Sequence, residues 1–300
     1  MRCQFRIFCV LTLISLSPSM AEEGRISLSL DDATREECLK VLRAGLRGDD
    51  FWPSIHAAEG LTVGGRGKEV IEYLTPKLAA ETDDQRRCGI VRELVRAGEK
   101  SRAHILLEIL AKSDDHGHIH AAECLYKLNI IGDGKAIGRA FRQNKNLRLK
   151  LMSAAALARK GNADAKAFLR ETLSHDDPVY LRTAAWVLGR IGDKSDIARL
   201  KQQLPRCSDP VVRATLQHSL AALGDPDGMA ALARNLNHAD SSIRTYAATF
   251  AGDARVINSK DALKKLLKDP NADTRYRAAQ SLLALSLPRR QSIRQNKSEE

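Results

Sequence analysis

Histidines close to acidic residues are the side chains in this sequence that could bind a metal. Three alternate histidines precede a glutamate: His116, His118, His120 and Glu123. His56 and Glu59 repeat the three-residue spacing earlier in the chain. On facing helices, such pairs can coordinate metal ions. Both pairs, however, enclose Ala-Ala, which is ordinary helix-forming sequence, and they belong to helices that are not sequence neighbours. We therefore predict no metal and no cofactor.

Other patterns that carry catalysis are missing from the sequence. It contains no G-x-S-x-G nucleophile turn, no glycine loop that cradles phosphate, and no paired zinc cysteines. The run Gly64-Gly65-Arg66-Gly67 is too short for phosphate binding. The sequence therefore predicts a protein that is not an enzyme.

Four arginines recur every 31 residues, and we call them the arginine ladder: Arg182, Arg213, Arg244 and Arg275. Ladder arginines follow an aspartate at about one helical turn, as in Asp209 to Arg213 and Asp240 to Arg244. A basic ladder with a function of its own is one interpretation, but this spacing favours structural residues that pair with a capping aspartate. They are therefore poor candidates for function.

Each ladder arginine lies in a unit that predicts two helices. Asp followed by Pro or Ser favours a helix start, and apolar residues then recur at helical spacing. Gly-Asp ends the first helix in the clearest units, because glycine accepts the left-handed conformation common there. Second helices are expected at 197–204, 229–236 and 262–267. The low aromatic content, 4%, with 43% hydrophobic residues also favours packed helices.

The segments 177–193 and 209–225 share the pattern D-P-x-V-R-x-x-A-A-x-x-L-G-x-x-G-D in outline. This pattern resembles HEAT-like repeats, specifically the short type found in phycobilin lyase subunits, over residues 49–285. The resemblance implies an all-α fold, a right-handed α-solenoid of about seven two-helix repeats plus a terminal helix. It also implies that second helices line a concave, partner-binding face. The family includes a di-iron hydroxylase with adjacent His-Glu pairs, and this sequence contains no His-Glu dipeptide.

Basic side chains lie along the predicted second helices. If those helices line the concave face, the following residues would form a positive groove: Arg139, Lys166, Arg170, Arg199, Lys201, Arg234 and Lys264. We call them the second-helix basic row. Such a groove would attract an acidic protein segment, an anionic polysaccharide or a phosphate-bearing lipid. A solvated helix face, where Lys and Arg are common, is the alternative interpretation.

Trp186 occupies a variable position of the repeat. Other units place Glu59, Glu123 and His218 there. A position that accepts glutamate and histidine is not expected to lie in the deep core. Trp186 is therefore predicted to be partly exposed and to anchor a partner, with packing against the next repeat as the alternative.

The first 21 residues predict a secretory signal peptide. Arg2 and Arg6 give a positive start, a short apolar run follows, and small residues precede a cleavage site after Ala21. The apolar run is shorter than a membrane span requires, so no stable span is expected after cleavage. An uncleaved anchor is the alternative. The sequence thus predicts an exported protein, periplasmic or secreted.

The remaining chain divides into three segments. Residues 22–48 are expected to form an N-terminal helical cap, 49–285 the repeats, and 286–300 a basic disordered tail. Four cysteines follow the predicted leader: Cys38, Cys88, Cys124 and Cys207. Their wide spacing is unlike a disulfide framework, and buried free thiols are expected.

Three functions are compatible with these features. The favoured one is an exported, non-catalytic scaffold that binds a protein partner, acidic or otherwise anionic, along its concave face. The first alternative is an enzyme or enzyme-partner subunit like the phycobilin lyases, although a secretory leader conflicts with a cytosolic chromophore. The second is nucleic-acid binding, which is allowed by the net charge of +9 that remains when Arg2 and Arg6 of the predicted leader are subtracted from +11. Export and few aromatic residues argue against it, so no nucleic acid is expected.

Overall fold

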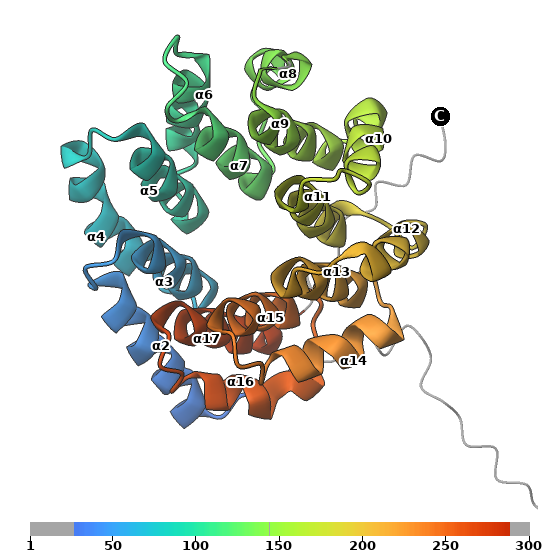
Figure 1. Ribbon diagram of the computed structural model, residues 1–300. Coiled ribbons are helices and arrows are strands. Elements are labelled where there is room, and N and C mark those ends of the chain that lie inside the picture. The colour runs from blue at the N-terminus through green and yellow to red at the C-terminus, as the bar shows by residue number, and fades with distance from the viewer. Residues whose placement is uncertain (1–26, 144, 289–300) are drawn as a thin grey trace, which may run out of the picture.

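The computed structural model describes residues 27–143 and 145–288 as a ring of helices (Figure 1). The predicted signal peptide at 1–21 and nearly all of the predicted tail lie outside the described residues. No helix among the described residues is long and apolar enough to cross a membrane.

Helices alternate between the inside and the outside of the ring (Figure 1). The inner helices are α3 (Phe51–Val63), α5 (Asp84–Ala97), α7 (His118–Leu128), α9 (Leu147–Arg159), α11 (Pro178–Ile191), α13 (Pro210–Ala222), α15 (Ser241–Asp253) and α17 (Ala272–Ser286). The outer helices are α4 (Gly67–Ala80), α6 (Ala103–Ala111), α8 (Lys135–Arg142), α10 (Ala163–Thr172), α12 (Asp196–Gln203), α14 (Pro226–Asn235) and α16 (Lys260–Leu266). The all-α repeat architecture is confirmed: seven inner–outer pairs are followed by α17 in the described chain.

The predicted helix starts are confirmed at the backbone. Asp177 accepts a hydrogen bond from the Val179 N–H at 2.8 Å, and Asp209 accepts from the N–H groups of Val211 and Val212. These bonds satisfy donors that a first helical turn leaves free. Capping side chains therefore fix where α11 and α13 begin, and the same kind of bond marks the start of α5, α9, α15 and α17.

Small residues explain why first helices form the inner circle. Most inner helices carry a buried alanine pair, such as Ala184-Ala185 and Ala278-Ala279. Small side chains let helix axes approach more closely. The inner circle of a ring is shorter than the outer one, so its helices must lie closer together. The alanine pairs thus favour the inner position for first helices.

Gly189 tests this explanation, because a Cβ there would lie 2.8 Å from Cα, Cβ and Oγ of Ser219 on α13. We expect Gly189→Ala to destabilise the protein by about 1–3 kcal/mol, measured by chemical denaturation. Gly138→Ala is the matched control, since its Cβ would meet only the flexible end of Arg142. That change should be neutral or stabilise by up to about 1 kcal/mol. Equal effects at both positions would contradict the close-packing explanation.

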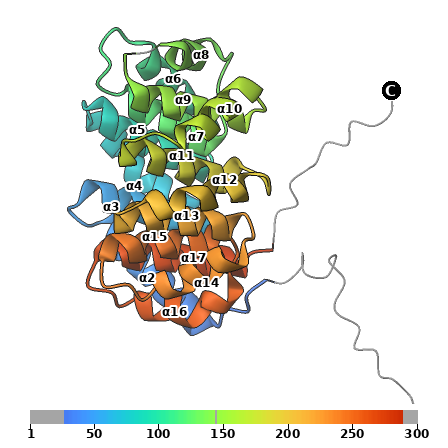
Figure 2. The same ribbon diagram turned by 45° about the vertical axis from the view of Figure 1, so that its right-hand side comes forward.

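The ring closes between its first and last elements. The helix α2 (Asp32–Leu46) packs on both α3 and α17, and α17 packs on α3. Figure 2 shows α17 beside α2 from a second angle. The Leu28 N–H donates to the Leu285 carbonyl at 2.9 Å, and Gly45 leaves room for the Tyr276 ring. The segment expected to cap one end of an open solenoid therefore contacts both ends.

The four cysteines of the described chain are free thiols and all are buried. This outcome agrees with the sequence interpretation. Cys124 donates its thiol to the Cys88 carbonyl at 3.4 Å, between α7 and α5. Burial raises the pKa of the Cys38 thiol to about 12.

Candidate functional site: the central cavity

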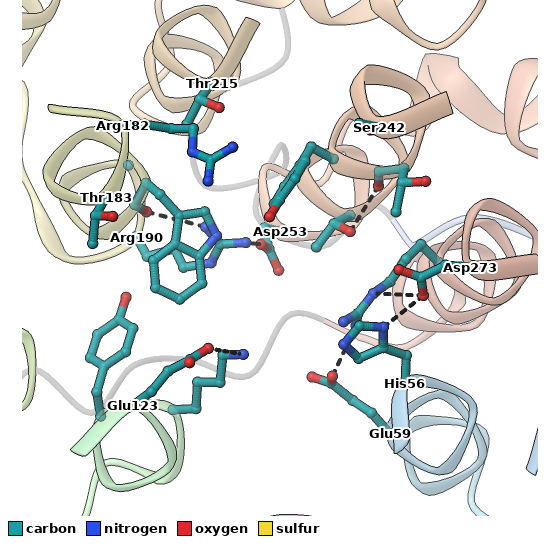
Figure 3. A pocket seen from close by; sticks show the side chains of 18 of the residues that line it. His56, Glu59, Glu123, Arg182, Thr183, Arg190, Thr215, Ser242, Asp253 and Asp273 are labelled. Atoms are coloured by element: carbon teal, nitrogen blue, oxygen red, sulfur yellow. Dashed lines mark hydrogen bonds and ion pairs between the residues drawn. The ribbon is translucent and has the colours of Figure 1, made fainter. Parts of the chain in front are cut away.

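A cavity of about 810 Å³ lies at the centre of the ring, and every inner helix contributes to its wall (Figure 3). In the inner helices that begin with a capping Asp or Asn, the residues that line the cavity stand at fixed distances along the chain from that cap. Six residues after the cap, the wall contains His56, Met152, Thr183, Thr215, Tyr246 and Arg277. Nine residues after it come Glu59, Trp186, Thr249 and Gln280. Thirteen residues after it come Arg96, Arg159, Arg190, Ala222 and Asp253. These offsets select one face of a helix.

The prediction that second helices line the concave face is wrong. All members of the second-helix basic row lie on outer helices, and none lines the cavity: Arg139, Lys166, Arg170, Arg199, Lys201, Arg234 and Lys264. The physical reason is the small-residue face described above, which draws first helices inward.

Acidic residues also neutralise much of that row. Lys166 lies 2.7 Å from Asp193, and Arg170 lies 2.6 Å from the buried Asp196. Lys201 similarly pairs with Asp225, and Lys264 with Asp31. Three members do come together, since Lys166, Arg170 and Arg199 line a small outer hollow between α10 and α12. The row is therefore a set of outer ion pairs and isolated cations, not a groove across five units.

Trp186 lies in the cavity wall and is half-buried, as its sequence position predicted. Its ring faces the guanidinium of Arg190 at 4.4 Å and meets the Tyr126 ring edge-on at 5.5 Å. The same reasoning is wrong for His218, which is fully buried on α13. His218 contacts Asn235 of α14 at 3.0 Å and lies beside Phe250 of α15. The same repeat position is thus half-buried on α11 and fully buried on α13.

Three of the four ladder arginines are structural, as predicted, but their partners differ from the expected ones. Arg213, Arg244 and Arg275 each donate to the carbonyl six residues earlier, at 2.6–2.7 Å. Each guanidinium therefore fastens the loop that precedes its own helix. Arg244 also makes a two-bond ion pair with Asp269, in the loop before α17.

Arg182 does not belong with the other three, so its interpretation as a structural ladder residue is wrong. It stands five residues after its cap, Asp177, whereas the others stand four after theirs. One residue turns a side chain by about 100° around a helix. Arg182 therefore lines the cavity, and Figure 3 shows its guanidinium directed into it. Among the described residues, no hydrogen bond or ion pair restrains this side chain.

A second set of repeated cations went unnoticed in the sequence, and we call it the inner basic arc: Arg96, Lys127, Arg159 and Arg190. Its members stand in the last turn of four successive inner helices, α5, α7, α9 and α11. Their spacing of 31 or 32 residues was a readable signal. Cations are favoured at helix C-termini in any case, which makes such a pattern easy to dismiss.

Most members of the inner basic arc are neutralised by carboxylates in the wall. Arg96 lies 2.8 Å from Glu59, and Lys127 lies 2.6 Å from Glu123. Arg190 reaches past α13 to Asp253 of α15, at 2.6 Å. Ala222 of α13 lies at the corresponding position, and its small side chain leaves room for this connection. These pairs fix the geometry of the wall.

Three cavity arginines lack a carboxylate partner in the described chain. Arg159 donates to the carbonyls of Tyr126 and Lys127, at the end of α7. Arg148 and Arg182 have no hydrogen bond or ion pair there. All three come from α9 and α11, which are neighbouring inner helices. In total the cavity lining contains seven Arg or Lys side chains against four Asp or Glu, so its charge is positive.

The opposite side of the cavity contains the closure between α3 and α17, which we call the seam. Arg277 lies 2.9 Å from Glu59, and His56 contacts Asp273 at 2.6 Å. Burial alone would raise the pKa of Glu59, but the charges of Arg96 and Arg277 lower it well below its usual value. Burial, aided by the charge of Arg277, lowers the pKa of His56 to about 4. The seam therefore contains a carboxylate anion and a neutral histidine near pH 7.

The histidines considered for metal binding are dispersed. His120 stacks on the Trp52 ring at 5.2 Å, His116 contacts Asp83, and His56 belongs to the seam. The part of the chain that the structure describes contains no group of three or more His, Cys, Asp or Glu side chains arranged for a metal. The His-Glu pairs of α3 and α7 instead serve ion pairing and ring stacking.

Sequence comparison identifies the architecture. The pattern that defines HEAT repeats matches residues 135–221 and 200–284, which together make up half of the chain. This chain belongs to the HEAT-repeat family. Comparison with curated proteins gives no match.

The solved structures to which this HEAT-repeat protein is similar have low sequence identity and low TM-scores. Human deoxyhypusine hydroxylase in complex with glycerol is 15% identical, covering 85% of this chain and 97% of the hydroxylase chain, with a TM-score of 0.38. One engineered protein is 16% identical over 87% of this chain and 97% of its own, with a TM-score of 0.33. Another is 17% identical over 83% and 96%, with a TM-score of 0.30.

Proposed function

We propose that this HEAT-repeat protein is a non-catalytic binding protein whose central cavity holds an acidic segment of a partner protein. The observation that carries the proposal is the pair Arg148 and Arg182, which lie in the cavity wall without a counter-ion among the described residues. A guanidinium has only donors, and carboxylates match its geometry. The cavity thus offers its strongest interactions to an anion.

Repeat proteins supply a second reason to expect a protein partner. HEAT arrays characteristically bind partners on their inner surface. In this protein the inner surface is closed into a ring, so a whole folded domain cannot enter a cavity of about 810 Å³. An extended segment or a chain end can. Local positive charge would also speed its approach.

The location that we propose rests on the sequence alone. Together with the binding function we propose that the protein is exported, on the basis of the leader-like residues 1–21. The acidic partner would then belong to the compartment outside the inner membrane or the cell. N-terminal sequencing of protein from the exported fraction tests this point. A chain that begins at Met1 in the cytosolic fraction would contradict it.

Peptide binding tests the cavity assignment. A fluorescein-labelled hexaglutamate peptide should bind at low salt, and Arg148→Glu with Arg182→Glu should weaken it at least about tenfold. The matched control reverses two outer cations, Arg199→Glu with Arg234→Glu. This control has the same net charge as the cavity variant and breaks no ion pair in the described chain. It should change affinity less than about twofold.

Two outcomes would overturn the proposal. One is an equal loss in the cavity and control variants, which would mean that affinity depends on overall charge. The other is tighter binding of a single-stranded oligothymidine than of hexaglutamate, lost only in the cavity variant, which would assign the cavity to nucleic acid.

A further inference from the structure

One wall of the cavity differs from the rest, and we call it the anchor wall. It is formed by α7, α9 and α11, and its side chains include Ile119, Tyr126, Met152 and Trp186. The facing helices α13 and α15 present mainly hydroxyl groups, such as Thr215 and Thr245. Tyr246 of α15 adds an exposed aromatic ring to that side. The anchor wall is thus the side that combines apolar side chains with the two unpaired arginines.

Tyr126 supplies an independent sign that this wall receives a ligand. Its side chain is 1% exposed, yet the hydroxyl has no hydrogen-bond partner within the described chain. Leaving a buried hydroxyl unsatisfied costs about 1–3 kcal/mol. Native proteins rarely retain such a group without a reason. A ligand acceptor in the cavity would satisfy it.

The donor chemistry of the wall restricts what that acceptor can be. Burial raises the pKa of Tyr126 to about 12, so its hydroxyl remains a neutral donor at physiological pH. Arg148 and Arg182 are donors as well. A carboxylate, which only accepts hydrogen bonds, fits all three. The half-buried ring of Trp186 and the thioether of Met152 lie on the same wall, where they can contact an apolar group.

We propose that the anchor wall selects acidic segments in which a large apolar side chain stands next to a carboxylate. The apolar side chain lies on Trp186 and Met152, while the carboxylate meets Arg182, Arg148 and the Tyr126 hydroxyl. This inference rests on the proposed function and specifies its ligand. Negative charge alone would then bind weakly, and the apolar residue would determine which partners are retained.

The test compares two peptides that differ at one position. Acetylated, amidated Glu-Glu-Phe-Glu-Glu-Glu and Glu-Glu-Ala-Glu-Glu-Glu carry the same charge, and titration calorimetry measures their affinities. The phenylalanine peptide should bind at least about fivefold more tightly, since a buried aromatic ring contributes about 1 kcal/mol or more. Trp186→Ala should remove this preference and leave the alanine peptide nearly unaffected. Tyr126→Phe should weaken both peptides about equally.

Fluorescence provides a second measurement, which does not require the Trp186→Ala variant to fold correctly. In a Trp52→Phe background, Trp186 is the one remaining tryptophan of the sequence. The phenylalanine peptide should shift its emission, and the alanine peptide should not. Equal affinities of the two peptides, or equal shifts, would overturn the anchor wall and leave the proposed function standing. Failure of both peptides to bind would overturn the proposed function itself.

Discussion

Replacing Glu59 with alanine should destabilise the protein by about 2 kcal/mol, because the seam would lose the carboxylate that joins Arg96 to Arg277, while Arg96 keeps its pair with Glu93. Glu59 on α3 lies 2.8 Å from Arg96 and 2.9 Å from Arg277. Its side chain is only 16% exposed, and that of Arg277 is 10% exposed. Chemical denaturation at pH 7 measures the loss.

The effect should be concentrated at the seam. Hydrogen exchange in Glu59→Ala should accelerate first in α2, α3 and α17, the elements that close the ring. Glu99→Ala is the control, since Glu99 pairs with Arg102 at the surface and should contribute less than about 1 kcal/mol. Equal losses of stability in both variants would mean that the ion pairs of Glu59 contribute no more than a surface pair. An even rise in exchange around the ring would mean that their loss does not act at the seam.

Closure and binding share residues, which links stability to function. His56, Glu59 and Arg277 belong to the seam and also line the cavity. An open solenoid would present the same inner helices as a concave surface, but its two end faces would remain uncovered. Closing the ring buries these faces against each other through α2 and α17. A ligand large enough to fill the cavity would touch both the anchor wall and the seam, and its binding should stabilise the closed ring.

The sequence predicted the units of this fold better than their arrangement. Capping aspartates and apolar periodicity identify each hairpin, because these are local interactions. Which helix of a hairpin faces inward depends on how closely neighbours approach, and this is set by contacts such as Gly189 against Ser219. The alanine pairs were visible in the sequence as a feature of the repeat. That they allow the closer helix spacing of the inner circle is clear only once the chain is known to curve into a ring. Ring closure depends on residues from opposite ends of the chain.

The candidate site was missed for a related reason. The sequence interpretation favoured residues that vary between second helices, while the cavity is lined by first helices. Among the binding residues predicted from the sequence, Trp186 alone lines the cavity. A one-residue offset from its cap distinguishes Arg182 from Arg213, Arg244 and Arg275, and that offset was readable. A regular spacing of 31 residues hid it, because spacing between units does not show which way a side chain points.

Lowering the pH from 6.5 to 4.5 should remove about 2–3 kcal/mol of stability through His218. Burial on α13, together with the charge of Arg190, lowers the pKa of His218 from 6.5 to about 3. The unfolded chain therefore binds a proton more readily than the folded one. A lowered pKa contributes stability that is fully present above about 6.5 and is lost as the pH falls toward 3. Denaturation midpoints measured across this range give the slope.

Variants assign that slope to one residue. His218→Gln keeps a polar contact to Asn235 and should flatten the dependence of stability on pH between 6.5 and 4.5. His116→Gln is the contrasting control, because its hydrogen bond to Asp83 raises the pKa of His116, and this contribution is instead lost as the pH rises. It should leave the acid slope intact. His56 adds a loss of similar size and the same sign, since its pKa is about 4, so His218→Gln should reduce the slope by about half. An unchanged slope in His218→Gln would mean that α13 opens and exposes His218 to water before this histidine takes up a proton. His218 would then be less firmly enclosed by its neighbours than the ion pair between Arg190 and Asp253 indicates.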